Sequence, residues 1–213
     1  MDEKIGILGS GVVGKALAEG FSRLGHSVKI GTRDPSKLQD FIQGKENVSI
    51  GSFEETAKFG DIIVMAVKGT EIESAMELAG EENFSEKVVI DTTNPLVVED
   101  NHPTMEIGYP ESNGKTMQDK LPETMVVKAF NTIPSHYMCA PKLEEGEPDF
   151  FYCGDDENAK EIVKDFAQQW GWKHFVDIGN IEESYLLEAL AMIYILYGFK
   201  NNHWNHAFKL LRK

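Results

Sequence analysis

The chain has 213 residues, which is enough for one α/β domain with a modest extension. It carries 35 aspartates and glutamates against 21 lysines and arginines, and the formal charge of −14 argues against nucleic acid and membrane surfaces as partners. In so acidic a chain, an anionic ligand must be held by local cations against a repulsive overall field.

The N-terminus, Met-Asp-Glu-Lys, is not an apolar leader, and no apolar run reaches the length needed to span a bilayer. Cys139 and Cys153 have neither metal-binding nor redox spacing. We therefore expect a cytoplasmic protein whose thiols are reduced.

The first predicted element is a strand, turn and helix that contain a glycine motif. A short apolar run, 5–8, leads directly into residues 9–14, GSGVVG, which fit G-x-G-x-x-G. Gly9 permits the tight turn, Gly11 lets a pyrophosphate approach the backbone, and Gly14 lets the helix pack close to its strand. The helix N-terminus adds N–H groups and a partial positive charge, so we expect dinucleotide binding here.

The end of the second strand indicates which dinucleotide is bound. An NAD-binding unit usually has an acidic residue there, about 20 residues past the glycines. This chain reads Gly31-Thr32-Arg33, and the next two residues, Asp34 and Pro35, resemble an N-cap followed by a first-turn proline. A hydroxyl, a guanidinium and Lys37 on the opening turn suit a 2′-phosphate, which favours NADP. The alternative is that Arg33 and Lys37 are ordinary solvated charges.

Further strands and helices alternate along the next part of the chain. We expect strands at 47–50, 61–67, 87–91 and 125–132, with helices at 52–58 and 70–79. This alternation predicts a doubly wound parallel sheet, whose ligands lie at the carboxyl ends of the strands. Residues 67–68 and 93–95 should therefore face the cofactor.

The segment 97–122 is the least regular part of the chain, rich in Asn, Gly, Pro and charged residues. We expect a loop with one short helix around 115–121. A loop of this length is often a lid over a site, and an unstructured excursion is the alternative.

The last third begins with strands again. We expect strands at 149–153 and 173–176 around a helix at 157–170, with Asp155-Asp156 forming an N-cap rather than a metal site. Residues 180–183, NIEE, resemble a capping box that opens a helix to about Tyr197. Because residues 186–199 are apolar on nearly every side, this helix is either a core helix or one shared between a dimer interface and an acceptor pocket.

The other groups of polar residues do not match a known catalytic or metal-binding arrangement. Ser135 and His136 are neighbours without a nucleophile elbow, which disfavours a hydrolase triad. His203 and His206 lie three apart, and without a third ligand they indicate a solvated helix face. We therefore expect no metal site and no catalytic acid or base.

The motifs together resemble a known family. The segments GILGSGVVGKALAEGFSRLGH, IGTRDPSK, VVIDTTNPL, VVKAFNTIP, FFYCGDDENAK and LLEALAMIYI, from Lys4 to about Tyr197, are similar to the NADP oxidoreductase, coenzyme F-420-dependent family. Members are small reductases that pass a hydride between NADPH and a deazaflavin. The resemblance implies a Rossmann NAD(P)-binding fold with a small C-terminal α+β lobe, and a dimer. With the apolar run at 186–199, we expect a homodimer that forms through the C-terminal helix.

We therefore expect an NADP-binding domain at 1–140 and a C-terminal lobe at 141–213, packed together as one unit. By the resemblance, Ser10 to Val13 line the pyrophosphate, Thr32, Arg33 and Lys37 surround the 2′-phosphate, and Val67, Ala129 and Asn131 border the nicotinamide. The full set of expected cofactor-binding residues is Gly9, Ser10, Gly11, Val12, Val13, Gly14, Thr32, Arg33, Lys37, Val67, Lys68, Asn94, Ala129 and Asn131.

The acceptor remains open between several classes. Lys68 stands where archaeal members have proline, and Asn131 where some have histidine. Coenzyme F-420, a flavin, a quinone-like compound or a metal chelate would each suit a small-molecule redox partner. Two other functions stay in view: a carbonyl or imine reductase of the 6-phosphogluconate or pyrroline-carboxylate reductase type, and a non-catalytic NADP sensor. The first usually carries a large helical domain, whereas here a short, strand-led segment follows Thr132.

Overall fold

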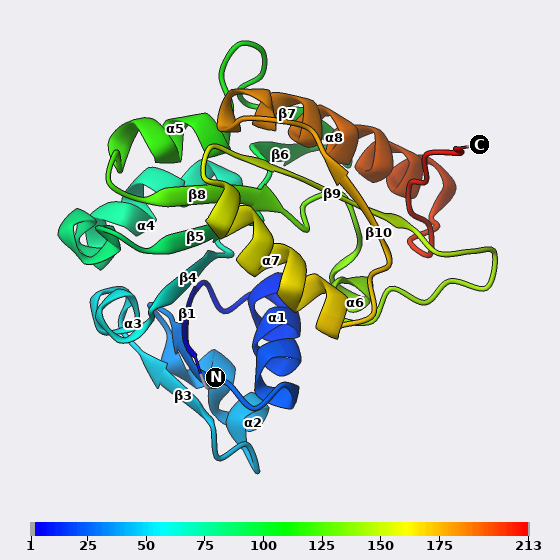
Figure 1. The fold of residues 1–213 in the computed structure, drawn as a ribbon. Coiled ribbons are helices and arrows are strands. Elements are labelled where there is room, and N and C mark those ends of the chain that lie inside the picture. Colours follow the sequence, from blue (N-terminus) through cyan, green and yellow to red (C-terminus); the bar gives the residue numbers. More distant parts are fainter. Residues whose placement is uncertain (1–2, 213) are drawn as a thin grey trace.

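An eight-stranded sheet runs through the computed structural model, which describes residues 3–212 (Figure 1). Its strands are β1 (Lys4–Leu8), β2 (Ser27–Gly31), β3 (Val48–Gly51), β4 (Ile62–Met65), β5 (Val88–Asp91), β8 (Met125–Ala129), β9 (Asp149–Gly154) and β10 (His174–Asp177). The order is β10-β9-β8-β5-β4-β1-β2-β3. From β3 to β8 all neighbours are parallel, whereas β9 runs antiparallel to β8. The predicted doubly wound α/β sheet is confirmed.

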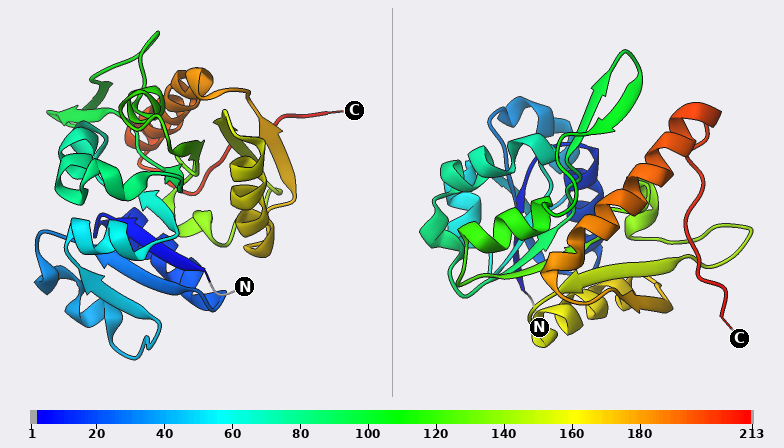
Figure 2. Two further views of the ribbon diagram at one scale, coloured as in Figure 1. Left: turned by 60° about the vertical axis from the view of Figure 1, so that its left-hand side comes forward. Right: turned by 90° about the horizontal axis from the view of Figure 1, so that it is seen from above.

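Helices cover both faces of this sheet (Figure 2). They are α1 (Val12–Arg23), α2 (Gln39–Ile42), α3 (Phe53–Phe59), α4 (Ile72–Ala79), α5 (Asn113–Lys120), α6 (Ser135–Met138), α7 (Glu157–Gln169) and α8 (Ser184–Asn201). Short 3₁₀ turns cover Pro35–Leu38, Gly69–Glu71, Glu81–Phe84 and Ile181–Glu183.

The two larger apolar cores lie on opposite faces of the sheet, because successive side chains of a strand point to opposite faces. On one face Ile5 and Ile7 join α1 and α7, where Phe21 packs edge-to-face on Phe166 and Trp170. On the other face Leu8 of β1, with Ile63 and Met65 of β4, packs against α3, α4 and α5. Strands β4 and β5 are buried at every position, as continuous apolar runs predict.

The irregular segment contains a hairpin that the sequence did not predict. Strand β6 (Leu96–Glu99) pairs antiparallel with β7 (His102–Met105), and the pair projects from the molecule (Figure 2, right). Asp100 and Asn101 make the turn with positive φ angles of 49° and 60°. Both residues tolerate this backbone region, which suits a two-residue hairpin loop.

The C-terminal third contains both confirmed and corrected elements. Asp156 caps α7 by accepting a hydrogen bond from the Ala159 amide, as predicted. The predicted capping box at Asn180 is wrong, because the Asn180 side chain makes no cap bond; Asp155 Oδ1 instead accepts from the Ile181 amide at 2.9 Å. Helix α8 ends at Asn201, followed by left-handed Asn202, so His203 and His206 lie beyond it and not on a helix face. Strands β9 and β10 continue the main sheet, and the division at residue 140 stays a prediction.

Candidate functional site

The three glycines of the first turn differ in what surrounds them. Gly9 has a φ of +123°, and a Cβ there would lie 2.4 Å from the Ala66 carbonyl oxygen. A Cβ on Gly14 would lie 2.1 Å from the Gly9 carbonyl oxygen, so these two positions require glycine for packing. A Cβ on Gly11 would meet no atom of the described chain within 4 Å. Gly11 therefore leaves space beside the backbone that a ligand can occupy.

The first turn of α1 suits an anion. Its N-cap, Gly11, has no side chain to occupy the free amides, and the described first turn contains no acidic residue. The first intrahelical bond runs from the Lys15 amide to the Gly11 carbonyl oxygen at 3.0 Å. The earlier amides and the helix dipole therefore remain available to a phosphate.

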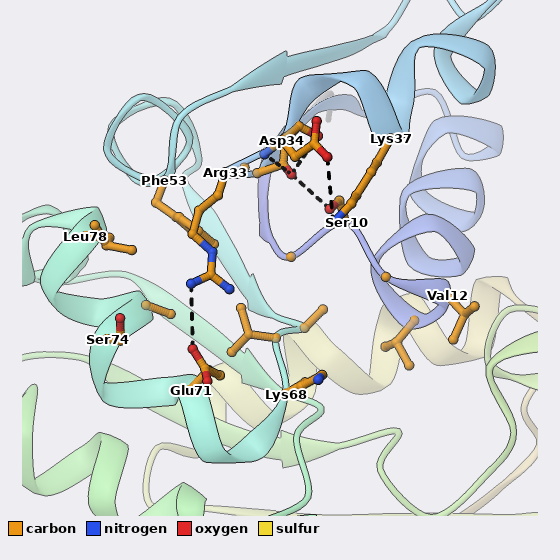
Figure 3. Close-up of a pocket in the computed structure, with 18 residues that line it drawn as sticks. Ser10, Val12, Arg33, Asp34, Lys37, Phe53, Lys68, Glu71, Ser74 and Leu78 are labelled. Atoms are coloured by element: carbon orange, nitrogen blue, oxygen red, sulfur yellow. Dashed lines mark hydrogen bonds and ion pairs between the residues drawn. The ribbon is translucent and has the colours of Figure 1, made fainter.

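A cavity of about 410 Å³ opens beside this turn (Figure 3). It is lined by residues 9–13, 31–34 and 66–68, with Lys37, Phe53, Glu71, Ser74, Ala75 and Leu78 completing the walls. In Figure 3, Phe53, Ser74 and Leu78 lie at one end and Val12 at the other. The apolar side chains at the first end suit a planar base; sequence reasoning missed them, because α3 and α4 carry them without any motif.

The end of β2 gathers polar and basic groups at the cavity. The Ser10 and Thr32 hydroxyl oxygens lie 2.9 Å apart, and the Asp34 amide donates to Thr32 Oγ1 at 3.1 Å. The side chains of Arg33 and Lys37 are 69% and 65% exposed. Their cationic groups and these hydroxyls match the donors that a phosphate monoester accepts.

Two carboxylates partly neutralise the positive charge at this end of the cavity. Arg33 lies 3.7 Å from Glu71 across the cavity, and Lys37 lies 3.8 Å from Asp34 (Figure 3). Hydrogen bonds from the side chain and amide of Ser36, helped by Lys37, lower the pKa of Asp34, which keeps it ionised as the cap of Pro35–Leu38. Both ion pairs are exposed and weak, so a phosphate can displace them. Glu71, the last residue of the 3₁₀ turn that precedes α4, was not predicted from the sequence as part of the site.

A second cavity of about 410 Å³ adjoins the first and shares residues 66–68 and Val13 with it. Its remaining lining comes from the turns after β4 and β5 and from the hairpin: Gly69, Thr92, Thr93, Asn94, Leu96 and Val98. Within residues 3–212, the lining side chains include one charged group, Lys68, and neither a carboxyl nor an imidazole. The cavity offers apolar contacts, hydroxyls and an amide, but no general acid other than this exposed lysine.

Three expected cofactor-binding residues lie behind these cavities and do not line them. Gly14 packs against Gly9, and Ala129 is fully buried in the core. Asn131 is also buried, and its Nδ2 donates to Asn94 Oδ1 and to the Leu187 carbonyl oxygen, each at 3.0 Å. Asn94 Nδ2 returns a bond to the Asn131 carbonyl oxygen at 3.1 Å. Asn131 thus fixes the Asn94 side chain, and its contact with a cofactor stays a prediction.

A buried ion cluster, which the sequence did not reveal, stands behind the second cavity. Lys128 Nζ lies 2.8 Å from Asp91 Oδ2 and 2.7 Å from Glu188 Oε1, and all three side chains are almost completely buried. Burial opposes the charge of Lys128, but the two carboxyl groups outweigh it and raise its pKa. Burial, reinforced by Asp91, raises the pKa of Glu188 despite Lys128. The one sequence signal was a lysine inside an apolar strand.

The remaining candidates lie away from both cavities. His136 Nε2 lies 3.2 Å from Asn205 Oδ1 of the C-terminal segment. Cys139 and Cys153 are free and buried, and burial raises the pKa of each thiol to about 12, which makes them poor nucleophiles. Within residues 3–212, no three His, Cys, Asp or Glu side chains are grouped to hold a metal ion. None of the helices there is long and apolar enough to cross a membrane.

Comparison with known proteins connects this geometry to a family. Residues 4–95 match the family model described as NADP oxidoreductase coenzyme F420-dependent. A crystal structure from Arthrobacter sp. FB24, provisionally designated an F420-dependent NADP-reductase, is similar with a TM-score of 0.93 and 30% identity, over 99% of this chain and 100% of that one. The F420-dependent NADP reductase of Methanocaldococcus jannaschii is 29% identical over 209 residues, covering 90% of this chain and 91% of that protein.

A second kind of relative is longer. Metalloreductase STEAP3 of Rattus norvegicus is 28% identical over 189 residues, which is 89% of this chain but 36% of the relative. The chain therefore spans about a third of the length of that metalloreductase, and the match concerns this part of it alone.

Proposed function

Because the chain belongs to the NADP oxidoreductase coenzyme F420-dependent family, we propose that this NADP-dependent oxidoreductase transfers a hydride between NADP(H) and a planar acceptor of the deazaflavin or flavin class. The observation that carries the proposal is the pair of adjoining cavities. The first has an anion-binding helix end and a basic corner, and the second has apolar walls without a carboxyl or imidazole among its described lining residues.

The cofactor residues have distinct proposed roles. Thr32, Arg33 and Lys37 hold the 2′-phosphate, with the adenine between Arg33 and the apolar wall at Phe53 and Leu78. The turn at residues 9–13 holds the pyrophosphate. Val67, Lys68 and Asn94 border the nicotinamide, and Gly14, Ala129 and Asn131 support these positions from behind.

The chain's contribution to the reaction is placement. NADP(H), when bound, supplies or accepts the hydride. The rigid carboxyl ends of β1, β4 and β5 set the distance and orientation of the two stacked rings. Such placement lowers the activation barrier by a large amount and needs no proton donor. Leu96 and Val98 of the hairpin line the acceptor side and offer apolar contacts to it.

This arrangement disfavours two alternatives. A carbonyl or imine reductase must protonate or polarise its substrate, and a positioned acid contributes about 10²–10⁴-fold, yet the only titratable side chain among the described lining of the second cavity is the exposed Lys68. A non-catalytic NADP sensor has no need of a second, adjoining cavity. The metalloreductase relative makes ferric chelates a reasonable acceptor to include in any assay.

The test of the proposal is an NADPH oxidation assay against a panel of acceptors: a deazaflavin, FMN, FAD, quinones, ferric chelates, and ketone and imine substrates. We expect turnover with deazaflavin or flavin. Turnover with the ketones or imines alone would contradict the proposal, and so would a failure with every acceptor.

We expect none of the three candidates that the sequence offered, Lys68, Ser135 and His136, to act as a catalytic acid. His136→Ala, Ser135→Ala and Lys68→Ala should each keep kcat within about tenfold, although KM can change. The rate should vary little from about pH 6 to 8, where a histidine titrates. Steady-state kinetics over that range are the measurement. A loss of two or more decades in kcat for His136→Ala or Lys68→Ala would support an acid-assisted reductase instead.

We also propose that the protein is a cytoplasmic homodimer assembled through α8. Along one side of that helix Leu186, Ile193 and Tyr197 are 44%, 59% and 50% exposed, a stripe of apolar side chains at helical spacing. Tyr194, in contrast, is buried against His206 and Trp204, and the exposed Tyr197 also contacts His206.

Charged substitutions at the exposed and at the buried positions of α8 should therefore behave differently. Ile193→Lys and Tyr197→Glu should give folded, soluble monomers, because they place a charge where a second subunit would lie. Tyr194→Glu is the matched control and should unfold the protein, because it buries an unpaired charge. Sedimentation with circular dichroism distinguishes these outcomes; a wild type that sediments as a monomer would rule out the dimer.

A further inference from the structure

The buried ion cluster joins β5, β8, α5 and α8 around the ammonium group of Lys128. Lys128 Nζ donates to Asp91 Oδ2, to Glu188 Oε1 and to the Thr93 carbonyl oxygen, the last at 2.6 Å. A lysine has three N–H donors, so these bonds use all of them. Asn113, the first residue of α5, joins the cluster by donating its amide to Glu188 Oε1 at 2.9 Å.

The two carboxyl groups of the cluster are held very differently. Asp91 uses both oxygens, since its Oδ1 accepts from the amide and the hydroxyl of Thr93 at 2.8 and 2.7 Å. Glu188 uses one oxygen: Oε2 is buried and has no hydrogen-bond partner among the described residues. A charged, buried and unpartnered oxygen would be strongly destabilising, whereas a protonated Oε2 leaves both bonds to Oε1 intact.

We infer that Glu188 is held as a neutral carboxylic acid and that it positions the wall of the second cavity through Asn113. Charge counting supports the first half. One ammonium group can neutralise one buried carboxylate, and Asp91, with three donors, is the better counter-ion. The second half rests on the proposed function, in which that cavity receives the acceptor.

Asn113 is the link between Glu188 and the cavity. Its Nδ2 donates to the Gly69 carbonyl oxygen at 3.0 Å and to Thr93 Oγ1 at 2.9 Å. Gly69 and Thr93 both line the second cavity, from the turns that follow β4 and β5. The two turns are in close contact, because a Cβ on Gly69 would lie 1.8 Å from the Asn94 carbonyl oxygen. A substitution at Glu188 therefore shifts Asn113, and through it both turns that line the second cavity. Glu188 is a positioning residue and touches neither cofactor nor acceptor.

A neutral Glu188 has a definite consequence for stability. Lys128 of β8 and Asp91 of β5 are the charged groups that act on Glu188, and Cys153 of β9 lies beside them with Glu183 and Asp177 near it. Burial raises the pKa of Glu188 above its ordinary 4.5, so the folded chain retains a proton that the unfolded chain loses. The contribution of Glu188 to the stability of the wild type must then fall as the pH rises above that ordinary value.

The first experiment examines the protonation state. Glu188→Gln preserves the neutral shape, so its melting temperature should match that of the wild type near pH 4.5 and exceed it increasingly toward neutral pH. Infrared spectra of the wild type should contain the carbonyl stretch of a protonated carboxylic acid that is missing from Glu188→Gln. A missing band, or a Gln variant that is less stable at neutral pH, would overturn the neutral acid. Both readouts are independent of activity.

The second experiment examines positioning with Glu188→Ala and Asn113→Ala. Each should raise the KM for the acceptor about tenfold, as expected for lost hydrogen bonds, with kcat and the Kd for NADPH little changed. Glu188→Gln should rescue the KM. Leu187→Ala, at the buried neighbour on α8, is the control: it should lower the melting temperature without changing the acceptor KM.

An equal KM increase in Leu187→Ala would show that the cluster is only structural and overturn the positioning role. If the wild type reduces none of the acceptors, the proposed function fails and the positioning role fails with it. The infrared band then still decides the state of Glu188. If Glu188→Ala does not fold, Asn113→Ala carries the same test.

Discussion

Gly11→Val should lower NADPH affinity by at least about a hundredfold, or about 2.7 kcal/mol, while the fold remains intact. The valine methyl groups would occupy the space where the pyrophosphate approaches the backbone. The protein itself has room for them, because a Cβ at Gly11 would meet no described atom within 4 Å. The backbone also accepts a side chain there, since the φ of Gly11 is −74°.

Two other glycines serve as controls for this change. Gly108→Val also adds a side chain in open space on the surface, and it should leave both affinity and melting temperature unchanged. Gly14→Ala should destabilise the fold, because its Cβ would lie 2.1 Å from the Gly9 carbonyl oxygen. Calorimetric titration with thermal melting is the measurement. Normal NADPH binding by Gly11→Val would overturn the proposed position of the cofactor.

Arg33→Ala and Lys37→Ala should each weaken NADPH binding about ten- to a hundredfold and leave NADH binding nearly unchanged. Each removes a charge-assisted bond to phosphate, worth about 1.5–3 kcal/mol. The global field does not help to hold the cofactor, because the formal charge of the chain is −14. Arg33→Ala also leaves Glu71 facing the same corner without its partner, so we expect it to have the larger effect.

Lys58→Ala is the matched control for these substitutions. It removes an exposed lysine that pairs with Glu54 on α3, away from the cavity lining, and should change neither affinity. Binding of both cofactors by each variant, measured at fixed ionic strength, tests the prediction. Equal losses for NADPH and NADH would show that Arg33 and Lys37 do not read the 2′-phosphate.

The parts of the fold that the sequence predicted are those encoded locally. The glycine turn, the apolar runs of β4 and β5, and the cap at Asp34 each depend on neighbouring residues, and the structure contains all of them. The doubly wound parallel sheet also followed, because strands that alternate with helices at this spacing form parallel crossovers; its strand order was not predicted.

The missed features depend on contacts between distant segments. Lys128 is 37 residues from Asp91 and 60 residues from Glu188 in the sequence, and nothing in the local pattern connects them. The hairpin of β6 and β7 was missed because its strands have four residues each and its turn lacks glycine. The histidines beyond α8 were misplaced because Asn202 ends that helix in a left-handed conformation, without a glycine or proline as a signal.

Transfer of deuterium is the most direct test of the central claim, which is that the two cavities bring NADPH and a planar acceptor together for hydride transfer. NADPH deuterated at the transferable position of the nicotinamide should be oxidised by the protein in the presence of 5-deazariboflavin in ordinary water. We predict that the deuterium appears on the ring carbon of the reduced deazaflavin, with a slower rate than for unlabelled NADPH. Oxidation of NADPH without label in the deazaflavin, or no oxidation at all, would contradict the account.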